Sequence, residues 1–121
     1  MSADPKDHCP PLALIYSTWP DPASAQSAAT TLLEEKLIAC ANILAPMTSV
    51  YEWRGRVECE TEIPALFKTS RATASKARDR LMALHPYEEP AIIGLATDAE
   101  ASSAPFARWV KAQTPETAGK P

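Results

Sequence analysis

The pattern of apolar and polar positions divides the chain into short strands and amphipathic helices. Residues 12–18 (LALIYST) form an apolar run too short for helical periodicity, which predicts a buried strand. Asp21 then offers a side-chain acceptor and Pro22 a fixed φ, a pair typical of a helix N-terminus. The apolar residues that follow recur at the i, i+3, i+4, i+7 spacing of one helix face. They are Ala25, Ala28, Ala29, Leu32, Leu33 and Leu37.

Residues 39–53 and 56–69 flank the dipeptide Arg54-Gly55 and predict a β-hairpin, because Gly55 can take the positive φ of a tight turn. With a two-residue turn, alternate residues share a sheet face. One face then carries Tyr51, Trp53, Arg56, Glu58, Glu60, Glu62 and Lys68. The other face carries Val50, Val57, Cys59 and Ile63. Pro46 and Pro64 cannot donate to a ladder, so bulges or an edge are expected there and the register beyond them is open.

Three further segments complete the order of elements. Residues 71–84 repeat apolar positions at helical spacing, which predicts a second helix. Residues 91–97 are predicted to form another buried strand. Residues 103–113 are predicted to form a terminal helix, in which we expect Trp109 to pack in the core. The order is β-α-β-β-α-β-α. It predicts an α+β protein, a ferredoxin-like βαββαβ sandwich with a long β-hairpin and an extra C-terminal helix.

The predicted hairpin is long for the domain that bears it. Two arms of about 14 residues would each extend roughly 45 Å, whereas a compact domain of this length has a radius of gyration of only ~14 Å. The hairpin therefore extends beyond the four-stranded sheet even if bulges break its arms. Because a two-stranded ribbon is not stable alone in water, we expect it to pair with other copies, in a closed ring that removes the exposed edges.

Composition narrows the class of protein. The chain has 121 residues and a net charge of −3, which suits one soluble domain and argues against a nucleic-acid or membrane partner. Three cysteines make an odd, sparse count that favours a reducing compartment, so we expect a cytoplasmic protein. We expect a single domain over residues 12–113, with flexible tails at 1–11 and 114–121.

The connection HPYEEP, residues 85–90, carries more chemistry than a turn requires. Pro86 and Pro90 restrict the backbone at the helix exit and the strand start. His85 titrates near neutrality and suits a metal ligand, a proton carrier or a pH-sensitive interface group. The structural alternative is that His85 caps a helix C-terminus. This alternative is favoured over a metal site, because a soft ion needs converging nitrogen or sulfur ligands and only carboxylates lie near His85 in the sequence.

Several short motifs follow one another over about residues 12–113. They are Cys40-Ala41-Asn42, Thr48-Ser49-x-Tyr51-x-Trp53-x-Gly55, Glu62 six residues before Lys68-Thr69, His85-Pro86-Tyr87-Glu88-x-Pro90, and Trp109. In this order and spacing the chain resembles the CutA family of divalent-cation tolerance proteins. The resemblance implies a ferredoxin-like homotrimer, similar in architecture to PII signalling proteins, with a non-enzymatic role in tolerance of copper and other divalent cations.

The resemblance also bears on metal binding. Family members proposed to ligate copper carry a cysteine at the end of the first strand and a second histidine before the HPY motif, where this chain has Ser17 and Leu84. Of that ligand set only His85 remains, with Cys40 as a further candidate for copper or another divalent cation. His8-Cys9 in the N-terminal tail is a weak, independent chelating pair.

The resemblance and the shared sheet face together predict a cleft between subunits. Its predicted members are Tyr51, Trp53, Glu62, Lys68, His85, Tyr87 and Glu88. The structural reading of Glu62 and Lys68 is an ion pair at a subunit interface, and Tyr51 and Trp53 are then contact anchors. The functional alternative is a PII-like sensor in which Lys68 and His85 hold a small anionic molecule. A third reading is a scaffold that only trimerises. The sequence shows no nucleophile elbow, phosphate loop or zinc signature, so we expect no enzyme.

Overall fold

The computed structural model describes residues 8–116. Its elements are β1 (Leu12–Trp19), α1 (Pro22–Glu34), β2 (Cys40–Ile43), β3 (Met47–Trp53), β4 (Arg56–Ser70), α2 (Ala74–Leu84), β5 (Ile92–Ala96), the short 3-10 helix η2 (Ala99–Ala101) and α3 (Ala104–Gln113). This order confirms the predicted α+β, ferredoxin-like arrangement with a long hairpin and an additional C-terminal helix. Within residues 8–116, no helix is both long and apolar enough to cross a membrane.

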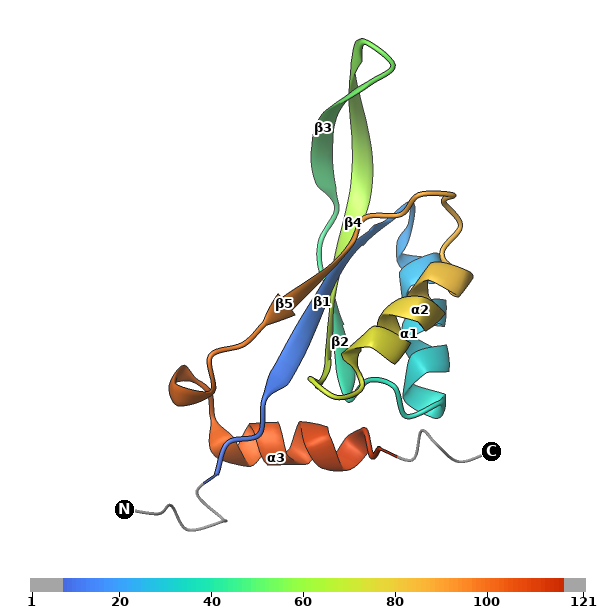
Figure 1. The fold of residues 1–121 in the computed structure, drawn as a ribbon. Helices are drawn as coiled ribbons and strands as arrows, with labels where there is room; N and C mark the ends of the chain where they lie inside the picture. The colour runs from blue at the N-terminus through green and yellow to red at the C-terminus, as the bar shows by residue number, and fades with distance from the viewer. Residues whose placement is uncertain (1–7, 117–121) are drawn as a thin grey trace.

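The sheet is antiparallel in the order β2-β4-β1-β5, with β3 paired to the far half of β4. Figure 1 shows α1 and α2 side by side on one side of the sheet, α3 across its lower end, and the β3–β4 hairpin extending from the opposite end. Asp21 caps α1 by accepting a hydrogen bond from the backbone N–H of Ser24 at 2.7 Å, and Pro22 follows it, as predicted.

The main core lies between the sheet and the two helices α1 and α2. Its fully buried members include Ile15, Trp19, Leu32, Phe67 and Leu81. A smaller cluster of Leu12, Ala39, Ala107 and Val110 anchors α3. Because Leu12 and Ile15 differ by an odd number of positions on β1, they point to opposite faces of the sheet, and α3 therefore covers the end of the face that α1 and α2 leave open.

A one-residue shift in register separates β2 from β3. Ile43 pairs with Ala65 and Met47 pairs with Glu62, so three residues of one arm lie opposite two residues of β4. The extra residue is a bulge, which confirms the expectation raised by Pro46. The expectation for Pro64 is confirmed too, because Ile63 and Pro64 are the two β4 residues that lie opposite the bulge, while the other edge of β4 pairs Pro64 with Thr18.

The turn of the hairpin is the predicted two-residue Arg54-Gly55. Both residues have positive φ, 53° and 79°, the conformation of the primed turns that match strand twist. The cross-strand pairs Trp53–Arg56 and Tyr51–Glu58 confirm the predicted faces of the ribbon. The hairpin buries little within one chain, and Val57 on its second face is 74% exposed.

Two predictions about burial are wrong for the single chain. The β5 strand was expected to be buried, but Ile93 and Leu95 lie exposed on the sheet face that α1 and α2 do not cover. Trp109 was expected in the core, but Ala107 and Val110 occupy the inward side of α3, and Trp109 instead packs its ring 5.7 Å from that of Phe106 on the outside.

Both ends of the described chain pack against the body. Pro10 and Thr114 are buried, so the flexible tails predicted for residues 1–11 and 114–121 do not extend to these two residues. The remaining tail positions, 1–7 and 117–121, lie outside the described residues.

Neighbouring leucines on α1 test the assignment of the core. Leu32 is fully buried and Leu33 is 41% exposed. Leu32→Ala should lower the free energy of unfolding by about 2–5 kcal/mol, because it removes buried methyl groups and leaves a cavity, whereas Leu33→Ala should cost less than about 1 kcal/mol. Urea denaturation of both variants at one protein concentration measures the difference, and equal losses would contradict this packing.

Candidate functional site

A groove lies where the hairpin leaves the body. It encloses about 740 Å³ between the hairpin and the loop that follows α2. Its lining residues are Thr18, Tyr51, Trp53, Arg54, Glu58, Glu60, Glu62, Tyr87, Glu88, Glu89 and Ala91. Five of the seven residues predicted for the cleft therefore line one groove within a single chain: Tyr51, Trp53, Glu62, Tyr87 and Glu88.

Strand alternation explains how the hairpin contributes to the groove. Glu58, Glu60 and Glu62 occupy alternate positions on β4 and share one face, and Tyr51 lies directly opposite Glu58 on β3. The two-residue turn at Arg54-Gly55 sets the register that places Tyr51 and Trp53 on this face, and the one-residue bulge before β3 joins it to the register of β2. Five glutamates and one arginine line the groove, so its potential is strongly negative.

Two tyrosines report this negative potential. The interaction of the Tyr51 hydroxyl with the Glu60 carboxylate, together with burial and the charges of Glu58 and Glu62, raises the pKa of Tyr51 to about 12. Burial, and then the charge of Glu62, raises the pKa of Tyr87. The Tyr87 hydroxyl donates a hydrogen bond of 3.3 Å to Oε2 of Glu62, which ties the loop to the hairpin. Both phenols therefore stay protonated at neutral pH and serve as donors.

His85 lies beneath the groove at the C-cap of α2 and is 7% exposed. The backbone N–H of Tyr87 donates to Nδ1 at 3.1 Å, so Nδ1 must be the unprotonated nitrogen. Nε2 then carries the hydrogen and donates to the carbonyl of Thr18 at 2.7 Å. The ring stacks on Trp19, with centroids 4.1 Å apart and an angle of 26°, and its centroid lies 4.8 Å from that of Tyr87.

This environment makes His85 a neutral, structural residue in the single chain. Burial lowers the pKa of His85, and the Thr18 carbonyl and the charge of Glu62 oppose that shift only in part. Both ring nitrogens are engaged, so coordination of an ion through either one requires the loss of a hydrogen bond. The position is that of the predicted helix cap, although the neutral ring gains nothing from the helix dipole.

The other predicted ligands lie away from the groove. Lys68 is six residues beyond Glu62 on β4, roughly 20 Å at the rise of an extended strand, so one chain does not bring the two together. The Lys68 ammonium lies 5.5 Å from the centroid of the Phe106 ring, and Cys40 lies opposite Lys68 on β2. No cluster of three histidine, cysteine or acidic side chains within residues 8–116 is arranged to hold a metal ion.

The two positions at which the family pattern is altered are both part of the fold. Ser17 is fully buried in the sheet between Ala65 and Ile92, and its hydroxyl has no hydrogen-bond partner among the described residues. Leu84 packs against the main core. Neither side chain offers the nitrogen or sulfur donor that a soft ion prefers.

Sequence reasoning missed several groove residues. Arg54, Glu58, Glu60 and Glu89 line the groove but were not among the predicted site residues. For Glu58 and Glu60 the signal was present, because strand alternation had already placed them on the face of Tyr51 and Trp53. Arg54 and Glu89 lie in a turn and a loop, where no periodicity predicts direction.

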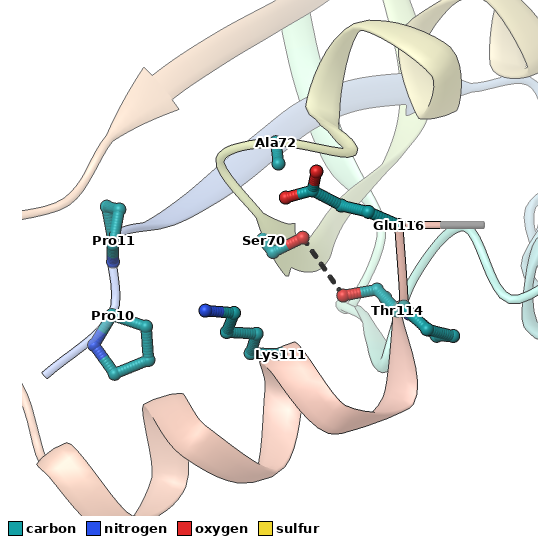
Figure 2. Close-up of a pocket in the computed structure, with 8 residues that line it drawn as sticks. Pro10, Pro11, Ser70, Ala72, Lys111, Thr114 and Glu116 are labelled. Atoms are coloured by element: carbon teal, nitrogen blue, oxygen red, sulfur yellow. Dashed lines mark hydrogen bonds between the residues drawn. The ribbon is translucent and has the colours of Figure 1, made fainter. Parts of the chain in front are cut away.

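A second cavity of about 360 Å³ lies at the opposite end of the sheet, where α3 meets β4 and the start of β1 (Figure 2). Its polar floor is a network of buried hydroxyls in which Ser70 donates to Thr73 at 3.0 Å and Thr114 contacts Ser70 at 3.0 Å. Lys111 reaches into the opening in Figure 2. Because these hydroxyls bond to one another, the cavity is best explained as the joint that holds the end of α3 against the body.

Fold and groove together define a class: a ferredoxin-like α+β protein with a protruding hairpin and an acidic, aromatic groove at the hairpin base. The chain belongs to the CutA1 divalent ion tolerance protein family, whose model matches residues 13–113. The divalent-cation tolerance protein CutA of Pyrococcus horikoshii is 36% identical over 103 residues, 85% of this chain and 98% of that protein. The protein of the same description from Thermus thermophilus is 39% identical over 82 residues, 68% of this chain and 80% of that protein.

Solved structures agree with this assignment. The divalent ion tolerance protein CutA1 of Ehrlichia chaffeensis superposes with a TM-score of 0.79 at 38% identity, covering 86% of this chain and 95% of that one. A structure described as the periplasmic divalent cation tolerance protein CutA of Archaeoglobus fulgidus gives a TM-score of 0.78 at 34% identity, covering 86% and 99%. The family predicted from the motifs is confirmed.

The buried, neutral His85 predicts how stability depends on pH. The folded state binds a proton at His85 less readily than the unfolded state, whose histidine pKa is near 6.5. The contribution of neutral His85 to the free energy of unfolding is therefore complete above about pH 6.5. It is lost as the pH falls from there toward the lowered pKa of His85 in the folded state. Urea denaturation between pH 7.5 and pH 5 should show this decline in the free energy of unfolding.

Substitutions at the two histidines test whether His85 causes this pH dependence of stability. His85→Phe keeps a stacking ring but cannot titrate, so its stability should change less between pH 7.5 and pH 5 than that of the parent chain. His8→Gln, at the exposed histidine, should leave the pH dependence as it is. A pH dependence that survives His85→Phe unchanged would show that other groups cause it.

Proposed function

We propose that this chain acts as a non-enzymatic homotrimer in the response to divalent cations, and that the acidic groove, completed by a neighbouring subunit, is its cation site. One observation carries the proposal: the groove is formed by a hairpin whose large apolar side chains Val50, Trp53 and Val57 are at least half exposed in a single chain. Membership of the divalent-cation tolerance family gives the biological context.

The uncovered apolar surface supports assembly. Large apolar side chains that are exposed in one chain gather on the open sheet face, the hairpin and the outside of α3. They include Val50, Tyr51, Trp53, Val57, Ile93, Leu95, Phe106 and Trp109. The outer edges of β3 and β5 have no strand partner in the described sheet. Head-to-tail pairing of two different edges closes into a ring of copies, which supports the homotrimer implied by the family resemblance.

Charge and donor chemistry support a cation in the groove. The lining carboxylates provide oxygen donors, which suit hard divalent ions such as Mg²⁺ or Mn²⁺ better than copper. A copper site through His85 requires that the ring give up its bond to Thr18 or to Tyr87. Because residues 8–116 of one chain hold no preformed triad of ligands, the proposed ion takes a further ligand from the neighbouring subunit.

The alternative of a PII-like sensor for a small anion has less support. It needs Lys68 near His85, but within one chain Lys68 lies beside Phe106 at the far end of the open face. An anion entering the groove would meet five glutamates. We also propose a cytoplasmic location, since all three cysteines are free.

A matched pair of charge insertions tests assembly. Light scattering of the intact protein should give about three times the chain mass of 13.1 kDa. Leu95→Asp places a charge on the open sheet face and should shift the mass toward a single chain. Met82→Asp, on the outer side of α2 and similarly exposed, should leave it unchanged. A folded, monodisperse species of 13.1 kDa in the parent protein would exclude the proposed trimer.

Calorimetry tests the ion. A His8→Gln/Cys9→Ala background removes the donors of the N-terminal segment. In this background, Mn²⁺ uptake should saturate near one ion per chain and weaken by about tenfold or more in Glu62→Gln, and Glu34→Gln on the exposed surface of α1 should bind as the parent does. Cu²⁺ uptake that depends on His85 and not on Glu62 would instead support the histidine-centred site.

A further inference from the structure

The groove differs from an ordinary ion site in having aromatic walls. Tyr51 and Trp53 from β3 and Tyr87 from the loop after α2 all line it, together with the glutamates. Aromatic faces attract organic cations, and they hold alkyl chains that a hydrated metal ion does not possess.

The spacing of the carboxylates also suits an elongated organic cation better than a single metal ion. Glu58, Glu60 and Glu62 alternate along one extended strand, so successive side chains are about 6.6 Å apart, twice the strand rise. Such a row does not converge on one point, and no three acidic side chains in the described part of the chain are placed to hold one ion. In an elongated cation whose charges are separated by short alkyl spacers, successive charges can lie against different carboxylates of the row.

The chain's own Arg54 shows that the aromatic wall accepts a cation. Its guanidinium lies 5.6 Å from the centroid of the Trp53 ring. This contact forms at the tip of the hairpin, at the end of the groove farthest from the body, and it leaves the carboxylates of Glu58 to Glu62 without a cationic partner among the ion pairs of the described residues.

Glu62 forms the inner end of the groove. It is 9% exposed, and its one hydrogen bond among the described residues is the 3.3 Å contact from Tyr87 to Oε2. Its second oxygen, Oε1, therefore has no protein donor although the side chain is nine-tenths buried. Oε1 is not among the buried unpaired atoms of the described residues, so it is open to the groove, where a donor that carries positive charge would bind it most strongly.

We propose that the groove binds a linear aliphatic polyamine, with an ammonium group on Glu62 Oε1, a second on the Glu58–Glu60 pair, and the alkyl chain against Tyr51 and Trp53. This inference rests on the proposed function, in that both treat the groove as a cation site, and it names an organic cation as the ligand class. The polyamine competes with a divalent ion for the same carboxylates.

Titration calorimetry of the full-length assembled protein with spermidine and putrescine, in about 0.15 M salt to screen surface charge, tests the proposal. Glu62→Gln should raise the spermidine Kd about tenfold and Trp53→Leu about threefold or more. Glu34→Gln and Trp109→Leu remove the same groups outside the groove and should change the Kd less than about twofold. Light scattering on each variant confirms that assembly is retained. Glu58→Gln replaces Glu62→Gln, and Tyr51→Leu replaces Trp53→Leu, if either of these dissociates.

The outcomes separate this inference from the proposed function. Spermidine binding that depends on Glu62 and Trp53 supports it. Mn²⁺ binding that depends on Glu62, with no heat from either polyamine, overturns the inference and leaves the proposed function standing. No binding of either cation overturns both. Equal losses in Glu62→Gln and Glu34→Gln mean non-specific electrostatic attraction only, which also overturns the inference.

Discussion

The structure depends on one strand that belongs to two parts of the molecule at once. β4 runs for 15 residues without a break, and its C-terminal half pairs with β1 in the body and its N-terminal half with β3 in the hairpin. Because its side chains alternate throughout, the buried series from Ile63 to Thr69 and the acidic series from Glu58 to Glu62 are fixed relative to each other. The core thereby sets the direction in which the groove faces.

Local patterns were sufficient to predict the elements of this fold. The cap and proline before α1, the helical spacing behind them and the turn at Arg54-Gly55 each encode a structure within a few residues. What they do not encode is which face of the sheet is left uncovered. Ile93, Leu95 and Trp109 have the side chains of core residues, and their exposure follows only from the placement of α1 and α2 on the opposite face.

The sequence predicted those parts of the candidate site that lie on one strand pair, but not the contacts that the fold makes between distant segments. Tyr51, Trp53 and Glu62 are related by strand alternation, so the sequence was enough to group them. Within one chain Glu62 and Lys68 stay apart, because six positions on an extended strand are a long distance although both side chains point the same way. Their pairing across a subunit interface stays a prediction. The bond between Tyr87 and Glu62 joins segments 25 residues apart, and only the fold brings them together. His85, chemically the most versatile residue of its motif, is committed to connecting Trp19, Thr18 and the loop.

The bulge between β2 and β3 has a consequence for how sequences of this kind can vary. Its single extra residue reverses the parity of the first arm relative to β4. Deleting one residue from positions 44–46 would leave two residues opposite Ile63 and Pro64, so the ladder would become regular and both β2 and β3 would keep their partners on β4. The connector can therefore change length without turning Tyr51 and Trp53 away from the glutamates. One residue gained or lost at the Arg54-Gly55 turn would instead disturb the register that places them there, a constraint that acts on spacing independently of which amino acids occupy it.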